Sequence, residues 1–178
     1  MKRRLSTLRH WLLIIVITGL VALGIRTWVL VPATVVGTSM RPTLEPGNYL
    51  VLQKFGQIKR FEVIVFKLDG TTYIKRVIGL PGERVSYKDD QLSINDHPVA
   101  EPFLTAKKDQ ETVLTSDFDL SVLTGHQTVP KGHYFVLGDN RRISKDSRTF
   151  GPIDETTIIG RAKLVYYPIS RMKLLSSK

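Results

Sequence analysis

The chain has 178 residues, which is enough for one compact domain and a membrane anchor but not for two full domains. Hydrophobic residues make up 42% of the chain and charged residues 24%, so the composition argues against global disorder. Because there is no cysteine, disulfides, thiolate metal sites and a cysteine nucleophile are excluded.

The net charge of +10 is concentrated near the N-terminus. Six basic residues precede Glu45, the first acidic residue, and the 20 basic and 16 acidic residues from Glu45 onward leave a net charge of only +4. No stripe of basic and aromatic residues and no known reader motif accompanies this charge, so we expect no nucleic-acid partner.

Residues 1–10 are basic and residues 11–31 are mainly apolar. The apolar run from Trp11 to Ile25 is short for a bilayer, which takes about 20 helical residues. An extension through Val31 supplies the length, with Arg26 reaching to the far interface. The positive-inside rule then predicts a cytoplasmic basic segment at 1–10, a transmembrane anchor at 11–31 and an extracytoplasmic domain at 32–178.

A cleavable signal peptide is the alternative interpretation of this segment, because Val31-Pro32-Ala33 fits a small-residue cleavage site. A buried core helix is disfavoured, since the run is apolar on every face. No later hydrophobic run is long enough to span a membrane. The composition favours an uncleaved anchor that places the protein in the cell membrane with a single pass.

The rest of the chain has the pattern of a mostly β domain, a barrel or a sandwich. Short segments rich in Val, Ile, Tyr and Phe predict strands at 49–52, 63–66, 73–78, 92–94, 134–137 and 162–166. Turn residues separate them at 45–47, 69–70, 81–82, 95–96 and 131–132. Residues 105–129 have the least pattern, and we expect a variable insertion there.

Three motifs contain candidate catalytic side chains. The first, GTSMRPTL at 37–44, contains Ser39, which taken alone also fits an ordinary turn. The second, YIKRVIGLPGE at 73–83, contains Lys75 on the same strand face as Tyr73 and Val77. Burial of that face would lower the pKa of the lysine amine and let it accept a proton near neutral pH, whereas an edge-strand lysine would point at water.

The third motif, GDNRRISKDSRTFG at 138–151, is a polar loop that directly follows an apolar strand. Loops held on a rigid scaffold often contain functional groups. Together with SMRPTL and YIKRVIGLPGE, and in this order after one hydrophobic span, it resembles type I signal peptidases, which remove signal peptides from exported preproteins. The resemblance covers about residues 26–160, including the string NDHPVAEPFL, and the single span is similar to Gram-positive members.

The resemblance implies a serine-lysine mechanism. Ser39 would attack the scissile carbonyl, and neutral Lys75 would take its proton and later activate the water that hydrolyses the acyl-enzyme. The backbone N–H of Ser39 would contribute to the oxyanion hole. Ser144 would hydrogen-bond and orient the lysine amine.

Further residues have supporting or binding roles in the same resemblance. Asp139, Asp146 and Arg148 would brace the site, with an ion pair between Asp139 and Arg76. The pocket for the residue before the cut would be lined by Val35, Met40, Leu44, Tyr73 and Ile74, and the pocket for the third residue before it by Ala33, Val35, Leu50 and Ile74. Such shallow apolar pockets would favour small residues such as alanine at the first and third positions before the cut, which is the A-x-A cleavage rule. The expected partners are preprotein signal peptides, the lipid bilayer and, as a candidate, the secretion translocon, and no cofactor or metal is implied.

Three positions depart from the family pattern. Gly37 stands where Gram-negative members place a serine that helps the oxyanion hole, and Ala33 replaces a residue that is often aromatic. After Arg60, Phe61-Glu62 stands where family members usually have a Gly-Asp pair.

Other functions fit the sequence less well. None of the four histidines, His10, His97, His126 and His133, stands in a catalytic string, and no G-x-S-x-G elbow or H-E-x-x-H spacing occurs. A self-cleaving repressor with a serine-lysine dyad would lack the span. A signal-peptidase-like protein that assembles surface polymers or pili without catalysis remains the alternative, but such relatives have lost the catalytic pair that this chain keeps.

Overall fold

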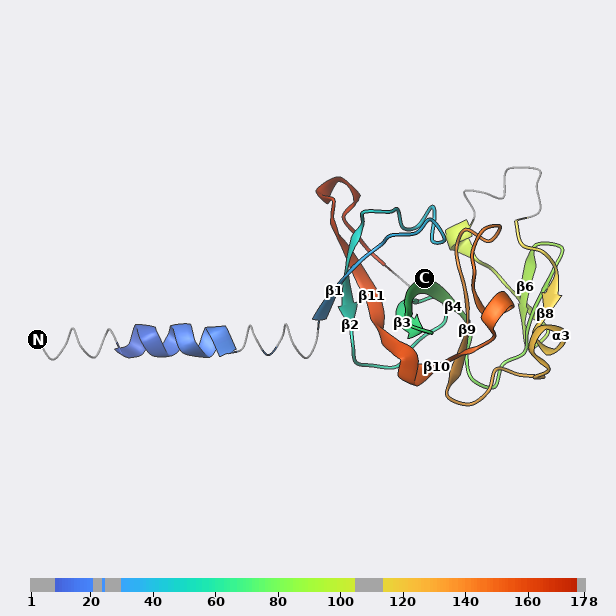
Figure 1. Ribbon diagram of the computed structural model, residues 1–178, viewed down its shortest axis with the longest axis horizontal. Helices are drawn as coiled ribbons and strands as arrows, with labels where there is room; N and C mark the ends of the chain where they lie inside the picture. The colour runs from blue at the N-terminus through green and yellow to red at the C-terminus, as the bar shows by residue number, and fades with distance from the viewer. Residues whose placement is uncertain (1–8, 21–23, 25–29, 105–113, 176–178) are drawn as a thin grey trace, which may run out of the picture.

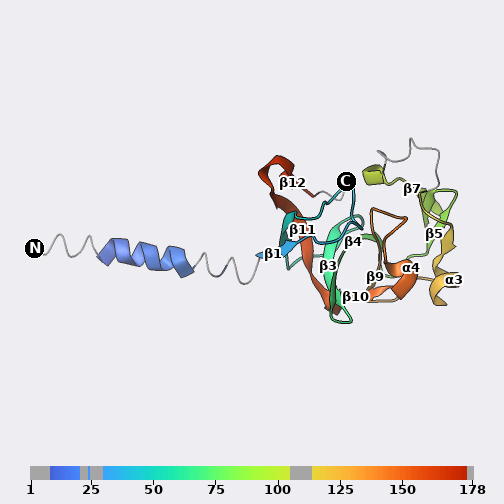
Figure 2. The same cartoon turned by 45° about the horizontal axis from the view of Figure 1, so that its top comes forward.

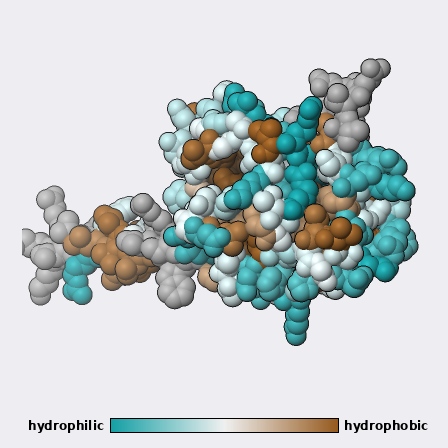
Figure 3. All heavy atoms as spheres, turned by 45° about the vertical axis from the view of Figure 1, so that its right-hand side comes forward, coloured by the Kyte–Doolittle hydropathy of each residue, from teal (hydrophilic) through white to brown (hydrophobic). Residues whose placement is uncertain are grey.

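The computed structural model describes residues 9–20, 24, 30–104 and 114–175 (Figure 1). Residues 9–20 form a helix whose large apolar side chains are exposed and give the brown cluster at the left of Figure 3. Within the described parts of the chain, no helix is both long enough and apolar enough to cross a membrane. The predicted span 11–31 falls partly outside the described residues.

The C-terminal end of that predicted span is wrong by two residues. Strand β1 (Leu30–Thr34) begins inside it, and Leu30 and Val31 pair with Gln53 and Leu52 of β2 (Tyr49–Gln53). An apolar run fits a strand over a protein core as well as it fits a lipid-facing helix. Val31 packs on the core cluster that includes Leu52, so the domain begins before Pro32.

The predicted mostly β fold is confirmed, and it consists of antiparallel sheets. Within the described residues the larger sheet has eight strands, in the order β1-β2-β11-β3-β4-β9-β10, with β12 paired to β11 (Figure 1). Its further members are β3 (Val63–Leu68), β4 (Thr71–Gly79), β9 (His133–Leu137), β10 (Ile153–Asp154), β11 (Ile158–Tyr167) and β12 (Lys173–Leu174).

A smaller sheet lies beside the large one in both cartoon views (Figures 1 and 2). In the described part of the chain it has four strands, in the order β7-β6-β5-β8. These are β5 (Val85–Lys88), β6 (Gln91–Ile94), β7 (His97–Val99) and β8 (Phe118–Asp119). Asn95 and Asp96 turn the chain between β6 and β7 with φ values of 51° and 65°, which Asn and Asp tolerate better than most residues.

The helical elements of the domain are short. They are η1 (Pro102–Leu104), α3 (Leu120–Thr124), α4 (Ser147–Phe150), η2 (Glu155–Thr157) and η3 (Ile169–Arg171). Part of the expected insertion belongs to the fold, because its strand β8 pairs with β5 and its residues Leu120 and Val129 are buried. Residues 105–113 of that segment lie outside the described residues.

Strand β4 is central to the larger sheet and positions the candidate site. It pairs with β3 on one side, where Lys75 faces Ile64, and with β9 on the other, where Arg76 faces Leu137. The loop at 138–151 leaves the end of β9 directly. Residues far apart in the sequence, from β4 and from this loop, are therefore brought to one end of the sheet.

Candidate active site

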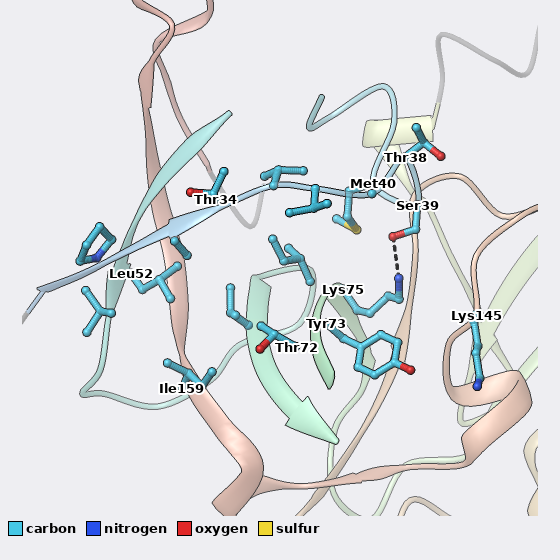
Figure 4. Close-up of a pocket in the computed structure, with 18 of the residues that line it drawn as sticks. Thr34, Thr38, Ser39, Met40, Leu52, Thr72, Tyr73, Lys75, Lys145 and Ile159 are labelled. Carbon is cyan, nitrogen blue, oxygen red and sulfur yellow. Dashed lines mark hydrogen bonds between the residues drawn. The ribbon is translucent and has the colours of Figure 1, made fainter. Parts of the chain in front are cut away.

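A cleft with a volume of about 670 Å³ runs along β1 and the segment that follows it to Met40 (Figure 4). Strands β2, β3, β4 and β11 supply its other walls. Ser39 and Lys75 lie toward one end, and Leu52 and Ile159 lie at the other. The cleft thus combines a mainly apolar groove with two reactive groups.

Ser39 and Lys75 contact each other directly. The distance between Ser39 Oγ and Lys75 Nζ is 2.6 Å, and the two atoms are hydrogen-bonded (Figure 4). A turn holds the serine, since the Arg41 N–H donates to the Thr38 carbonyl at 3.1 Å. The Asn140 N–H donates to the carbonyl of Ser39 at 2.9 Å and ties the turn to the 138–151 loop. The geometry allows a proton to move between the hydroxyl and the amine.

Burial changes the acidity of the lysine. Lys75 is only 3% exposed, and desolvation lowers its pKa from 10.5 to about 8. The nearby carboxylates of Asp146 and Asp139 oppose this shift, and Arg148 adds to it. A lysine with this pKa is partly neutral near pH 8, so it can act as a general base there.

An ion pair fixes the residue next to Lys75 on β4. Arg76 Nε and Nη2 donate to the two carboxylate oxygens of Asp139 at 2.8 and 2.6 Å, and both side chains are almost completely buried. Arg76 Nη1 also donates to the carbonyl of Phe61 at 2.8 Å, and the ring of Phe103 lies 4.0 Å from the guanidinium. The predicted pairing of Asp139 with Arg76 is confirmed, and it joins β4 to the 138–151 loop.

Asp146 closes the same loop on itself. Its buried carboxylate accepts the N–H of Gly138 at 3.0 Å and two donors of the Arg148 guanidinium at 2.9 Å each. Arg148 also donates to the carbonyl of Arg141 at 2.7 Å. These contacts fix the loop beside Lys75 and hold two of the three charges that influence its pKa, those of Asp146 and Arg148.

Comparison with known proteins identifies the family. The protein-family model described as "Signal peptidase, peptidase S26" matches residues 8–167 of this chain. Signal peptidase I V of Bacillus subtilis (strain 168) is 47% identical over 159 residues, which is 85% of this chain and 95% of that protein. Signal peptidase IB of Staphylococcus aureus is 36% identical over 177 residues, which is 93% of each chain. The chain belongs to the signal peptidase family, peptidase S26.

A solved structure supports the same assignment for the fold. The crystal structure of a signal peptidase I from Enterococcus faecalis V583 matches with a TM-score of 0.57 at 42% identity. The match covers 60% of this chain and 97% of that one. As a type I signal peptidase of this family, the chain is a serine endopeptidase.

One position of the signal peptidase differs from what the resemblance implies. Ser144 Oγ is buried and makes no hydrogen bond with any described residue, so its expected bond to Lys75 is absent. Ser144 packs against Gly138 instead. A Cβ on Gly138 would lie 2.2 Å from Ser144 Oγ and 2.6 Å from the carbonyl oxygen of Ser39, so only glycine fits there.

Most of the predicted substrate-binding residues line the cleft. These are Ala33, Val35, Met40, Tyr73 and Ile74. Leu44 and Leu50 do not line it; both are buried members of the core cluster that also contains Val35 and Met40. The sequence analysis missed Leu52, Val65 and Ile159, which do line it. Leu52 lies two residues beyond Leu50 on β2 and shares its strand face, so strand alternation could have found it.

A second buried cluster beside the 138–151 loop was not predicted. Arg141 forms an almost fully buried ion pair with Glu101, and Tyr87 donates its hydroxyl to the same carboxylate. Burial and the neighbouring Glu101 raise the pKa of Tyr87 to about 12. Arg141 Nε donates to the carbonyl of Gly138 at 3.0 Å. The cluster therefore attaches the small sheet to the loop of the signal peptidase that surrounds Lys75.

The Phe61-Glu62 departure has a structural consequence. Phe61 adopts a φ of 66°, a left-handed conformation that favours glycine. Its ring packs edge-on against Phe103 with centroids 5.2 Å apart, and Phe103 covers the guanidinium of Arg76. Glu62 pairs with Lys163 and accepts the Lys59 N–H at 3.0 Å. Phe61 therefore supports Arg76 through its carbonyl and through the ring of Phe103, whereas the side chain of Glu62 binds other groups.

The histidines lie away from the reactive pair. None of the four, all of which are described residues, lines the cleft. His97 Nδ1 and His133 Nδ1 contact the carbonyls of Asn95 and Lys131, two residues earlier in each case, at 2.8 and 3.0 Å. Both contacts are local, and no histidine takes the place of Lys75 beside Ser39.

Proposed function

We propose that this signal peptidase removes N-terminal signal peptides from exported preproteins with Ser39 as the nucleophile and Lys75 as the general base. The observation that supports this most directly is the 2.6 Å hydrogen bond between Ser39 Oγ and a buried lysine with a pKa of about 8. The apolar groove beside the pair is suited to an extended peptide.

In the acylation step, neutral Lys75 accepts the proton of the Ser39 hydroxyl while Oγ bonds to the scissile carbonyl carbon. The tetrahedral intermediate then expels the amine of the mature protein, which takes a proton from the lysine ammonium. The signal peptide is left as an ester on Ser39. In the second step Lys75 removes a proton from water, the hydroxide attacks the ester, and Ser39 leaves with the proton.

The negative oxygen of each intermediate needs hydrogen-bond donors. The backbone N–H of Ser39 supplies one in this proposal. Gly37 has no side chain to supply a second, and apart from its chain neighbours no atom of the described residues lies within 4 Å of the point where its Cβ would be. In this proposal the second hydrogen bond to the oxyanion comes from another group, such as a backbone N–H of the turn at 37–40.

The apolar groove favours small residues before the cut. The wall on which Ala33, Val35 and Met40 lie is faced by Ile74 of β4, and all four line the cleft. In this proposal the core side chains Val35 and Met40 form the floor of shallow pockets that accept small residues, so the enzyme cuts after an A-x-A pattern.

Residues ahead of β1 would anchor the enzyme. The basic residues at 2–9 would stay in the cytoplasm, and the apolar residues that follow them would cross the bilayer, so that the β domain acts on the extracytoplasmic face. Its substrates would reach it as preproteins that emerge from the secretion translocon while their signal peptides lie in the same bilayer.

A cleavage assay tests the proposal. The full chain and its Ser39→Ala variant are each incubated in detergent with a preprotein that has an A-x-A site, and the products are sequenced from their N-termini. We expect cleavage after the second alanine by the wild type and none by the variant. Cleavage by both would assign the activity elsewhere, and cleavage by neither would favour a non-catalytic assembly role. Sequencing the enzyme's own N-terminus would distinguish an anchor from a cleaved leader.

A further inference from the structure

Lys145 is an exposed cation at the edge of the cleft. It belongs to the 138–151 loop and lines the cleft together with Ile143 (Figure 4). It forms no ion pair and no side-chain hydrogen bond with the described residues. The adjacent carboxylate of Asp146 is fully buried and bound to Arg148 and Gly138, so it does not neutralise the lysine.

Lys145 lies on the side of the reactive pair where the substrate residues after the scissile bond are expected. Lys145 and the apolar residues Leu52 and Ile159 lie on opposite sides of Lys75 (Figure 4). The scissile carbonyl must meet Ser39 Oγ, which is hydrogen-bonded to Lys75. If the apolar groove takes the residues before the cut, the chain after the cut leaves the reactive pair on the side where Lys145 lies.

We infer that Lys145 is a specificity-determining residue that binds an acidic side chain in the first residue after the scissile bond. This inference rests on the proposed function. An unneutralised ammonium at the cleft edge attracts a carboxylate and repels a cation, and it favours the substrate without touching the reacting atoms. Ile143, which is exposed beside it, leaves the other face of this subsite apolar.

The expected effect is modest because the lysine is in contact with solvent. Exposed ion pairs change equilibrium and rate constants by about two- to five-fold, and salt screens them further. A preference of this size is measurable as a ratio of kcat/KM values between matched substrates. The ratio should also fall as the ionic strength rises.

The test uses three preproteins that differ only in the first residue after the cut, which is Asp, Asn or Lys. The full-chain enzyme in detergent is compared with Lys145→Gln and Lys145→Glu. Arg142→Gln is the matched control, because Arg142 is an exposed cation of the same loop that does not line the cleft. We expect a preference for Asp over Lys of about two- to five-fold in the wild type and in Arg142→Gln. The ratio should be close to one in Lys145→Gln and inverted in Lys145→Glu.

The outcomes separate this inference from the proposed function. Equal cleavage of the three substrates by the wild type, or an unchanged preference in Lys145→Gln, would overturn the role of Lys145 and leave the protease assignment intact. If Arg142→Gln lost as much of the preference as Lys145→Gln, the preference would come from the total charge of the loop, and the specific role of Lys145 would be overturned as well. No cleavage of any substrate by the wild type would overturn both.

Discussion

Arg76 and Asp139 form a buried two-point ion pair between the strand that contains Lys75 and the loop that follows β9. The two residues are 63 positions apart in the sequence. Removal of one partner would leave the other charged and desolvated, which costs much more than an exposed pair.

We therefore expect Asp139→Ala to lower the free energy of unfolding by about 3 to 5 kcal/mol. The double variant Arg76→Met/Asp139→Leu should lose less than the single variant, because no buried charge is left unpaired. Urea unfolding of the full chain in detergent measures both. A double variant that loses as much stability as Asp139→Ala, or more, would contradict the coupling.

Ser39→Ala and Lys75→Ala should each lower kcat by about 10⁴-fold or more, since neither group is effective without the other. The double variant should lose no more than the worse of the two. Preprotein cleavage measures this, and His133→Ala is the control because His133 lies in a local turn contact away from the cleft. A large loss in His133→Ala with activity kept in Lys75→Ala would reject the dyad.

The pH dependence follows from the pKa of Lys75, which burial lowers to about 8. The base must be neutral, so kcat/KM should rise with pH and level off above about 8. The profile in a Ser39-dependent cleavage assay measures the apparent pKa of the free enzyme. A flat profile from pH 6 to 10, with chemistry shown to limit the rate, would exclude the lysine as the base.

The same shift affects stability. The folded pKa of Lys75 lies below its unfolded value of 10.5, so the unfolded state binds the proton more tightly between the two values. The lysine therefore destabilises the fold by about 3 kcal/mol at pH 7, and this cost falls as the pH rises from about 8 toward 10.5. Lys75→Met should raise the melting temperature at pH 7, with a smaller gain at pH 10. An equal gain at both pH values would argue that packing rather than charge is responsible.

Gly138→Ala should disturb the site through contact rather than charge. The new methyl group would meet Ser144 Oγ at 2.2 Å and the carbonyl of Ser39 at 2.6 Å, so the loop or the nucleophile must shift. We expect a loss of stability of about 1 to 3 kcal/mol together with a drop in kcat. Gly37→Ala is the control for stability, because nothing lies within 4 Å of its Cβ position. Equal unfolding free energies for the two variants would contradict the close packing at Gly138.

The sequence predicted β2, β3, β4, β6, β9 and β11 because alternation and turn residues are local properties. Besides β1, it missed the short strands β5, β7, β8, β10 and β12, which have two to four residues each, and β7 contains Pro98. It also extended the anchor over Leu30 and Val31, because hydrophobicity alone does not distinguish lipid from protein core.

The reactive pair could be predicted only in part. Alternation indicated that Lys75 shares a face with apolar neighbours, but the approach of Ser39 depends on a turn 36 residues away. The motif resemblance supplied that link. The partnership of Arg141 with Glu101 joins residues 40 positions apart on different parts of the fold, and no local pattern marks it. Leu44 and Leu50 were predicted to line the cleft, yet which apolar side chain of the core reaches the cleft depends on the packing of the whole sheet.

The order of strands in the large sheet has a consequence for the timing of folding. Strand β11, the last long strand in the sequence, lies between β2 and β3 and contributes Ile159 to the cleft. The cleft walls from β1–β2 and from β3–β4 are therefore joined only when residues near the C-terminus have arrived. Contacts of such long sequence separation form late and slowly. A nascent chain that ends before Ile158 would lack an assembled cleft, so we expect the enzyme to cleave substrates only after its whole domain has been made.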